Sequence, residues 1–339
     1  MMKEHLKALC ELPGVSGSEE QVRAYILSVL QASPVEKEIT VDSLGNILCH
    51  LRGENRAAKK VMFAAHMDEV GFIVRGITDD GYLQFETVGG IDKSVLCGRR
   101  VRLGTQVGVI GCKAIHLCEK DEAEVLPEAK ALLIDIGANS REEAEKTVAI
   151  GDTAVFDTPF TEMQSLVMAK AVDDRAGCTL LLELAQKMPP YDITLAFTVQ
   201  EEVGLRGAGV AAFSERPDIA VAIDGTTAND VADVPKEKWV CTVGSGAVVS
   251  FMDRATVYDP ALYRQIREIA DSLHLPNQTK TVIVGGNDAG AMQRAAGGAR
   301  VAAVSLPCRY IHSPSSVVSL KDMENTGALL FALTEKLPQ

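Results

Sequence analysis

Two patterns of hydrophobic and polar positions alternate along this chain. Towards both ends, apolar runs of strand length come between segments in which apolar residues recur with helical periodicity. The strand-like runs are 36–42, 45–53, 60–69, 193–200, 219–224 and 299–307. The helix-like segments are 4–32, which contains a turn, and 173–188, 207–215, 260–275 and 322–337. Alternating strands and helices predict an α/β domain with three layers, α/β/α, in which a sheet lies between helices.

The middle of the chain has a different pattern. Between about Val70 and Asp157, short runs rich in β-branched and aromatic residues are separated by glycine-containing turns. A turn signal roughly every 8–12 residues is typical of a small β-barrel or β-sandwich. The sequence therefore predicts an α/β domain of residues 1–67 and 158–339, interrupted by a β domain at 68–157. Within that β domain, the polar segment 119–129 is predicted to be a loop.

Composition and charge exclude several classes of protein. The 339 residues are 47% hydrophobic and 24% charged, which is typical of globular proteins, and the net charge is −12. An acidic chain is poorly suited to nucleic acid, because phosphate binding requires a basic surface. No apolar run reaches the roughly 18–20 residues of a membrane helix, so no membrane association is expected. The eight cysteines include no C-x-x-C pair and are expected to be reduced in a cytoplasmic protein.

Acidic residues and histidines gather where the predicted strands end or the following helices begin. They are His66, Asp68, Asp173, Asp174, Glu201, Glu202, Asp224 and His312. Ligands of open α/β sheets bind beyond the carboxyl ends of the strands, so these side chains are expected to converge on one edge. Imidazoles combined with carboxylates suit zinc, cobalt or manganese.

Each of these residues also has a simpler interpretation on its own. Asp173 and Asp174 are compatible with a helix N-terminus, where carboxylates cap free N–H groups. Glu201 and Glu202 are compatible with a solvated turn, and His66 with a loop histidine. However, these simpler interpretations need a separate explanation for each residue. Each of them also leaves an acid or an imidazole at the end of a buried strand. A shared pair of metal ions explains all of them at once.

Several segments together resemble a known family. They are VDSLGNIL (41–48), AAHMDEVGFIV (64–74), AKAVDDRAGC (169–178), TVQEEVGLRGA (198–208), AIDGT (222–226), GGNDAG (285–290) and RYIHSPSSV (309–317). In this order, and over nearly the whole chain, they resemble the signature segments of the tetrahedral, or glutamyl-type, aminopeptidases. These are dinuclear metallopeptidases, some of which have been labelled endoglucanases. Two positions depart from the family pattern: Gly225, where a bulkier residue is common, and Asn287, where threonine is usual.

The resemblance implies a role for each candidate. The implied metal ligands are His66 and Asp224 for one ion, Glu202 and His312 for the other, and Asp173 as the bridge between them. Glu201 is the implied general base, which accepts a proton from a water that the metals activate. Asp68 is expected to accept the second ring N–H of His66 and so to fix its tautomer. The peptide bond before Asp174 is expected to be cis, and Asp288 is expected near the active site.

The fold, the cofactors and the assembly are implied in the same way. The family combines a zinc-peptidase-like α/β/α domain with a small PDZ-like β domain that forms dimers, and the dimers commonly build a hollow dodecamer. The implied activity is a hydrolase that removes N-terminal residues from peptide substrates, with two divalent ions per subunit: zinc, cobalt or manganese. The preferred N-terminal residue, the native metal and the choice between dimer and dodecamer stay open.

Two other functions are alternatives to an aminopeptidase. A deacylase or carboxypeptidase of the same co-catalytic clan would keep the metal pair and change the substrate. A binding or assembly protein with a decayed site is disfavoured, because every implied ligand position and Glu201 are occupied by the expected residue type.

Overall fold

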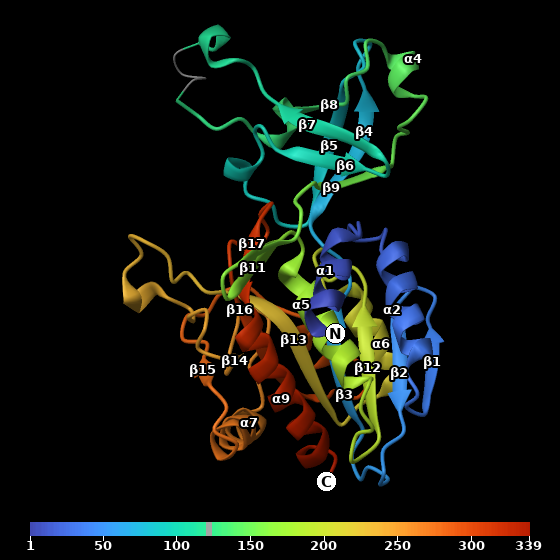
Figure 1. Ribbon diagram of the computed structural model, residues 1–339, viewed down its shortest axis with the longest axis vertical. Helices are drawn as coiled ribbons and strands as arrows, with labels where there is room; N and C mark the ends of the chain where they lie inside the picture. The colour runs from blue at the N-terminus through green and yellow to red at the C-terminus, as the bar shows by residue number, and fades with distance from the viewer. Residues whose placement is uncertain (120–123) are drawn as a thin grey trace.

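The structure is a computed structural model, which describes residues 1–119 and 124–339 (Figure 1). Residues 120–123 belong to the predicted loop 119–129 and lie outside the described residues. The described chain forms an 11-stranded sheet with helices packed on it, and a closed barrel that stands above the sheet in Figure 1. The mixed α/β fold predicted from the hydrophobic pattern is therefore confirmed.

Parallel strands occupy the centre of the large sheet. In spatial order, its main path is β1 (Lys37–Val41), β2 (Ile47–Leu51), β12 (Ile193–Thr198), β3 (Val61–His66), β13 (Ile219–Thr227), β16 (Arg300–Arg309), β17 (Ser316–Ser319), β11 (Leu166–Ala169) and β10 (Thr161–Met163). Off this path, β14 (Ala247–Val249) pairs with β16, and β15 (Asn277–Thr279) pairs with β14. The pairs β12–β3, β3–β13 and β13–β16 are parallel. The carboxyl ends of these strands therefore meet at one edge, which is where the sequence predicts the ligands.

Strand β3 is buried along its whole length because the sheet is covered on both faces. Phe63 and Ala65 belong to one hydrophobic cluster, and Met62 and Ala64 belong to another. The first cluster includes residues of α1 (Met2–Glu11), α2 (Glu20–Ala32), α5 (Val172–Leu184), α7 (Pro260–Ser272) and α9 (Leu320–Lys336), and the second includes residues of α6 (Arg206–Glu215) and α8 (Ala289–Met292). Strands buried on both faces have continuous apolar sequences, as β3 does. Among the described helices, none has both the length and the apolar character of a membrane span.

The barrel is formed by the middle of the chain. Around it lie β4 (Gly71–Ile77), β5 (Leu83–Val88), β8 (Leu133–Asp135), β7 (Gln106–Gly111), β6 (Arg100–Leu103) and β9 (Thr153–Phe156), with the short helix α4 (Arg141–Ala144) at one end. Its core includes Phe72, which makes edge-to-face contacts with Phe85 and Phe156 at centroid distances of 5.2 and 5.1 Å. Closure pairs both edges of the sheet, so no strand edge is left open in the barrel.

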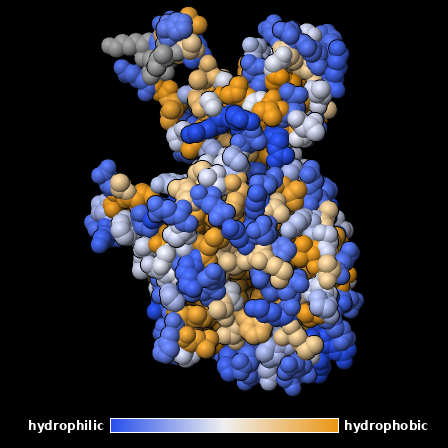
Figure 2. Space-filling model, viewed as in Figure 1, coloured by the Kyte–Doolittle hydropathy of each residue, from blue (hydrophilic) through white to orange (hydrophobic). Residues whose placement is uncertain are grey.

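A narrow waist joins the barrel to the larger body (Figure 2). There the turn after β5 passes against the carboxyl edge of the large sheet. A Cβ atom added to Gly89 would lie 2.7 Å from Val70 Cγ1 and 3.3 Å from Glu202 Cβ. A Cβ atom added to Gly90 would lie 3.4 Å from Nδ1 of His312. The barrel therefore borders directly on two of the candidate ligands.

Some elements were not predicted from the sequence. The strands β10, β11, β14, β15 and β17 are three or four residues long, which is too short for a period of two to be recognised. The N-cap residue of α2 is Glu19, and its side chain makes no hydrogen bond to the N–H groups of the helix. Its carboxylate instead accepts the N–H groups of Gly17 at 2.7 Å and Gln200 at 3.2 Å.

Candidate metal centre

The carboxyl edge of the parallel strands brings the candidate side chains together. They are His66 at the end of β3, Asp224 in β13, Glu201 and Glu202 after β12, His312 after β16, and Asp173 at the start of α5. After β12 ends at Thr198, the chain turns through Gln200 (φ 57°) and Gly204 (φ 120°). Because the strand has ended, two neighbouring glutamates can face one site, whereas on a strand they would point to opposite faces.

Asp173 lies between the two histidines. Its Oδ1 is 3.3 Å from Nε2 of His66, and its Oδ2 is 3.7 Å from Nε2 of His312. On the His66 side, Oδ1 of Asp224 is 3.7 Å from the same Nε2. On the His312 side, Oε1 of Glu202 is 3.2 Å from Nε2. The site thus has two halves, each with an imidazole and a carboxylate, which share the carboxylate of Asp173.

The donor atoms are suited to divalent metal ions. Three groups of donors have all their atoms within 4.8 Å of one another: His66, Asp173 and Asp224; Asp173, Glu202 and His312; and His66, Glu201 and Glu202. Imidazole nitrogens and carboxylate oxygens are the donors that zinc, cobalt and manganese accept. Asp173 belongs to the first two groups, so its two oxygens are available to two neighbouring ions. The residues present therefore fit a divalent metal centre.

The acids of the site are crowded and buried. Burial raises the pKa of Asp224 well above its usual range, and the charge of Asp173 raises it further. Burial also raises the pKa of Glu201 well above its usual range, with neighbouring carboxylates adding to the rise. Like charges this close cannot all ionise without positive charge between them. A divalent cation would supply that charge.

Both histidines of the site have raised pKa values, which favours a protonated ring while no cation is bound. Burial by itself would lower the pKa of His66, but hydrogen bonds to acids, first Asp173, outweigh it and raise the pKa well above its usual value. His312 has the same balance, and hydrogen bonding to Glu202 raises its pKa to about 9. Metal ligation requires neutral imidazole, so a cation would displace these protons on binding.

Asp68 is completely buried beside His66. Nδ1 of His66 is 3.4 Å from Oδ1 of Asp68 and 3.2 Å from its backbone carbonyl oxygen. The carboxylate of Asp68 also accepts the backbone N–H groups of Glu201 at 3.0 Å and Glu202 at 3.1 Å. The hydroxyl of Ser16 donates a further hydrogen bond at 2.6 Å. Asp68 therefore orients both the His66 ring and the turn that carries the two glutamates.

Asp174 connects the start of α5 to the end of β3. Its Oδ2 accepts the backbone N–H of His66 at 3.2 Å, and its Oδ1 accepts that of Gly177 at 3.0 Å. A Cβ atom at Gly177 would lie 2.4 Å from Oδ1, so this position requires glycine. The peptide bond between Asp173 and Asp174 is cis, as the family resemblance implies. The carboxylate of Asp174 is thus engaged by the backbone.

Sequence reasoning missed a buried ion cluster next to the site. Glu69 accepts hydrogen bonds from Nζ of Lys170 at 2.6 Å and from Nη2 of Arg175 at 3.2 Å. The lysine also donates to the backbone carbonyl of Leu12 at 2.8 Å. Lys170 and Arg175 lie on either side of Asp173 in the sequence, so the cluster holds the segment that carries Asp173. The only sequence signal was the presence of two bases close to an acidic pair, which is common on protein surfaces.

Asp288 was expected near the active site, and it belongs to none of the donor groups. Its Oδ2 accepts a hydrogen bond of 2.6 Å from the hydroxyl of Thr198, the last residue of β12. Burial raises its pKa to about 6. The neighbouring Asn287 donates from Nδ2 to the hydroxyl of Tyr258 at 2.9 Å and accepts the N–H of Ala289 at 3.0 Å. The hydrogen bond between Thr198 and Asp288 therefore joins this segment to the end of β12.

An open cleft of about 420 Å³ gives access to the donors. Its lining includes the four acids Asp173, Glu201, Glu202 and Asp224, together with His312. His66 is 2% exposed and lies behind them. The opening is large enough for the end of a peptide, and the charged edge of the sheet forms its floor.

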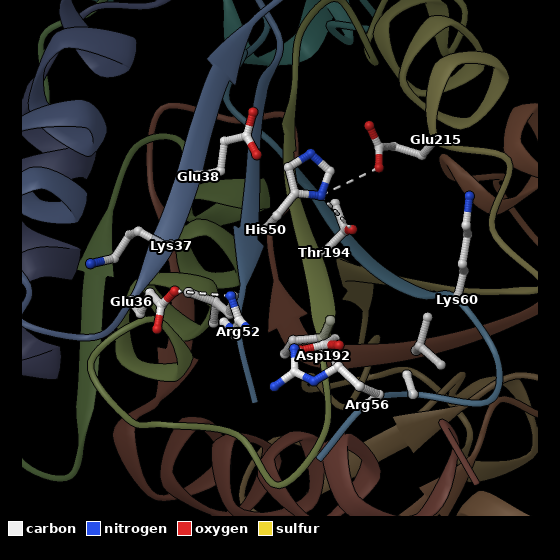
Figure 3. A pocket seen from close by; sticks show the side chains of 14 residues that line it. Glu36, Lys37, Glu38, His50, Arg52, Arg56, Lys60, Asp192, Thr194 and Glu215 are labelled. Carbon is white, nitrogen blue, oxygen red and sulfur yellow. Dashed lines mark hydrogen bonds and ion pairs between the residues drawn. The ribbon is translucent and has the colours of Figure 1, made fainter. Parts of the chain in front are cut away.

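A second hollow lies at the opposite edge of the sheet, beside the amino ends of β3 and β12 (Figure 3). It has a volume of about 510 Å³. Its charged side chains largely pair with one another: Arg56 with Asp192, Arg52 with Glu36, and His50 with Glu215 at 3.6 Å. No donor group for a metal occurs there among the described residues. This hollow is larger than the cleft at the carboxyl edge, but the chemistry favours the cleft.

Comparison with known proteins gives a consistent result. The family model for M42 glutamyl aminopeptidases matches residues 45–329. The chain is 35% identical to a lysyl aminopeptidase of Pyrococcus furiosus over 346 residues, 98% of this chain and 97% of the relative. An aminopeptidase from the archaeon Desulfurococcus kamchatkensis superposes with a TM-score of 0.93 at 34% identity, over 99% of this chain and 95% of that one. The TET1 peptidase of Pyrococcus horikoshii, which can assemble into a tetrahedron or a large octahedral shell, superposes with a TM-score of 0.86 at 35% identity, over 98% and 99%. The chain therefore belongs to the M42 glutamyl aminopeptidase family.

Proposed function

We propose that this aminopeptidase uses two divalent metal ions held at the carboxyl edge of the sheet. His66 and Asp224 would hold one ion, Glu202 and His312 would hold the other, and Asp173 would offer one carboxylate oxygen to each. The observation that supports this assignment is the position of Asp173, whose two oxygens face the two histidines at 3.3 and 3.7 Å. Two cations a few ångströms apart require an anion between them, because neutral ligands alone leave strong repulsion. Zinc, cobalt and manganese all suit these donors.

Bound at this site, divalent ions would lower the pKa of the attacking water and polarise the scissile carbonyl. Glu201 is the general base. Its carboxylate accepts a proton from the attacking water and later delivers it to the nitrogen of the leaving amine. The α-amine of the substrate would bind near the metal ions and these acids, which favours cleavage after the first residue. Asp68 holds the backbone of Glu201 and so keeps this base in place.

The proposal is tested with metal-free protein reconstituted with zinc, cobalt or manganese in turn. Each form is given peptides with a free N-terminus and the same peptides N-acetylated. We expect hydrolysis of the free-amine peptides only, with release of the first residue. Activity restricted to acetylated peptides would instead favour a deacylase of the same clan, and release of the last residue a carboxypeptidase. The aminopeptidase relatives do not favour either alternative.

The domain arrangement belongs to the same proposal. Residues 1–67 and 158–339 would form a three-layer, zinc-peptidase-like catalytic domain, and residues 68–157 a PDZ-like domain that forms dimers. The barrel of strands β4–β9 is compatible with that role, because its β7 strand exposes Val107 and Val109, which are 43% and 38% accessible. A homo-oligomer is supported by the shells of the TET1 peptidase. Light scattering with and without metal would measure whether dimers of this chain build a dodecamer. The cytoplasmic location stays a prediction.

A further inference from the structure

Four consecutive backbone N–H groups beyond the end of β12 donate to buried side chains. In chain order, the bonds run from Val199 to Asn46 at 2.9 Å, from Gln200 to Glu19 at 3.2 Å, and from Glu201 and Glu202 to Asp68 at 3.0 and 3.1 Å. The three acceptor side chains are almost completely buried. Buried backbone N–H groups require acceptors, and here side chains from three distant segments supply them. These side chains therefore determine the course of the turn that carries the two glutamates.

Gln200 has an unusual backbone conformation in this turn. Its φ is 57°, in the left-handed region, which costs a residue other than glycine about 1–2 kcal/mol. Such a conformation persists where the surrounding structure holds it on several sides. The N–H of Gln200 donates to Glu19, and its carbonyl accepts the N–H of Arg206 at 3.2 Å. Because Glu201 is the next residue, the direction of the proposed base follows from these two contacts.

Glu19 is a buried carboxylate without a basic partner. It is 2% exposed, and no lysine, arginine or histidine of the described residues forms an ion pair with it. Its Oε1 accepts only backbone N–H groups, those of Gly17 at 2.7 Å and Gln200 at 3.2 Å. Because burying a carboxylate without a counter-charge costs stability, the contribution of this side chain lies in the backbone that it holds.

The loop that carries Glu19 is itself anchored beside the site. The N–H of Glu69 donates to the carbonyl of Gly14 at 2.9 Å, and the hydroxyl of Ser16 donates to Asp68 at 2.6 Å. Both bonds join the loop between α1 and α2 to the loop after β3. Glu19 therefore acts on the turn after β12 from a fixed position.

We infer that Glu19 is a positioning residue for the reaction, which fixes the direction of Glu201 through the backbone of Gln200. This inference rests on the proposed function, because it takes Glu201 as the general base. Glu19 belongs to none of the metal-donor groups, so its loss should displace the base without removing a ligand. A misplacement of about 1 Å can cost on the order of 100-fold in rate. Asp68 still holds part of the turn, so the loss should be smaller than removal of the base itself.

The first test separates the hydrogen bonds of Glu19 from its charge. Glu19→Gln keeps an oxygen that can accept both N–H groups, whereas Glu19→Ala removes it. Metal-loaded enzyme is assayed with the aminoacyl p-nitroanilide that the unaltered chain cleaves fastest. We expect Glu19→Ala to lower kcat on the order of 10–100-fold, with less than about a twofold change in KM and in metal content. Glu19→Gln should restore kcat to within about threefold of the unaltered value.

Glu20→Ala is the matched control. Glu20 is the neighbouring acid at the start of α2, and its side chain is 67% exposed, so its removal should leave kcat unchanged. If Glu19→Gln loses as much activity as Glu19→Ala, or if Glu19→Ala changes KM or metal content rather than kcat, the inference is wrong while the proposed function stands.

A double-mutant cycle shows whether Glu19 acts through Glu201. In Glu201→Gln the base is already lost, so adding Glu19→Ala should lower the residual kcat by less than about twofold. The same fold loss in both backgrounds would show a general structural role for Glu19 and would overturn the inference alone. A Glu201→Gln variant with unaltered kcat would instead refute the proposed base, and the inference with it.

Hydrogen exchange tests the contact without turnover. In the metal-free chain, the amide of Gln200 should exchange at least about tenfold faster in Glu19→Ala than in the unaltered protein, and Glu19→Gln should match the unaltered protein. Mass spectrometry of a peptide covering residues 197–205 measures this rate, and circular dichroism shows whether each variant is folded. If Glu19→Ala does not fold, Glu19→Asp, which is one methylene shorter, takes its place with the same expectation. Unchanged exchange in the folded variant would show that Glu19 does not hold the turn, whatever happens to kcat.

Discussion

Oδ1 of Asp68 accepts the backbone N–H of Glu201 at 3.0 Å. This contact joins the loop after β3 to the turn after β12. The carboxylate of Asp68 therefore lies next to both the proposed base, Glu201, and the proposed ligand His66. The N–H of Glu202 and the hydroxyl of Ser16 also donate to the carboxylate of Asp68, and Nδ1 of His66 lies 3.4 Å from its Oδ1. A fully buried carboxylate with this many donors has its orientation determined by its surroundings.

The first prediction concerns Asp68. In Asp68→Asn, one oxygen becomes an NH₂ group that faces other donors, so the turn carrying Glu201 should shift. We expect kcat to fall on the order of 10–100-fold with little change in KM, measured by steady-state kinetics together with metal content. Ser16→Ala removes a single donor and should lower kcat by less than about tenfold. An Asp68→Asn variant with unaltered kcat would show that Asp68 does not position the base.

The second prediction separates the two adjacent glutamates. Glu201→Gln keeps the shape of the side chain but cannot accept a proton, so kcat should fall on the order of 100–10,000-fold while metal content is retained. Glu202→Gln should instead reduce the metal content, because Glu202 is 3.2 Å from His312 in one half of the site. Elemental analysis and kinetics on the same samples distinguish the two. Equal metal loss in both variants would refute this division of roles.

The third prediction concerns Gly225, where this chain departs from the bulkier residue that is common in the family. A Cβ atom at Gly225 would lie 3.0 Å from Cγ and 3.1 Å from Oδ1 of Asp173. Gly225→Ala should push the bridging carboxylate aside and weaken metal binding about tenfold or more, as measured by competition with a chelator. Gly209→Ala is the control, since its Cβ would meet only Ala291 Cβ at 3.8 Å. Unchanged metal affinity in Gly225→Ala would mean that Asp173 can move without loss of function.

The fourth prediction concerns the buried ion cluster. Glu69→Gln would leave the ammonium of Lys170 and the guanidinium of Arg175 buried without their counter-charge. We expect the free energy of unfolding to fall by about 3–5 kcal/mol, measured by urea denaturation of the metal-free protein. Glu162→Gln breaks the exposed pair with Lys3 and should cost less than about 1 kcal/mol. Similar losses in both variants would show that burial does not strengthen the cluster.

The fifth prediction is a dependence of stability on pH. Asp259 caps α7 and pairs with Arg300, and this hydrogen bond lowers the pKa of Asp259 to about 2. In the unfolded chain the pKa of an aspartate is about 4. Because the folded pKa is lower, the charged carboxylate stabilises the folded protein at pH values above about 4, and this stabilisation is lost as the pH falls to about 2. Asp259→Asn keeps a capping oxygen and should cost about 0.5–1 kcal/mol at pH 7, because the pair is partly exposed. The difference in unfolding free energy between the two proteins should shrink between about pH 4 and pH 2; a constant difference would contradict this account.

The sequence by itself determined the fold class and the chemical types at the site. Central strands such as β3 and β13 are buried, so their apolar runs are continuous. The first polar residues after these runs are His66 and Asp224, which lie at the carboxyl edge of the sheet. Parallel strands place their carboxyl ends together, so the candidate ligands could be predicted to meet without knowledge of any distance.

The tertiary structure decided which groups touch. The pairing of Asp68 with the backbone of Glu201 and the enclosure of Glu69 by two bases join segments far apart in the chain. Hydrogen bonds to backbone N–H groups leave no residue-specific signal in the sequence. The sequence also does not distinguish a buried lysine from an exposed one. The short edge strands could not be predicted from the sequence either. Strands of three or four residues form because neighbouring strands are already in place to pair with them, and not because of a local pattern. Local pattern therefore predicted the elements and the metal chemistry, while long-range packing determined orientation and the charge that a substrate would meet.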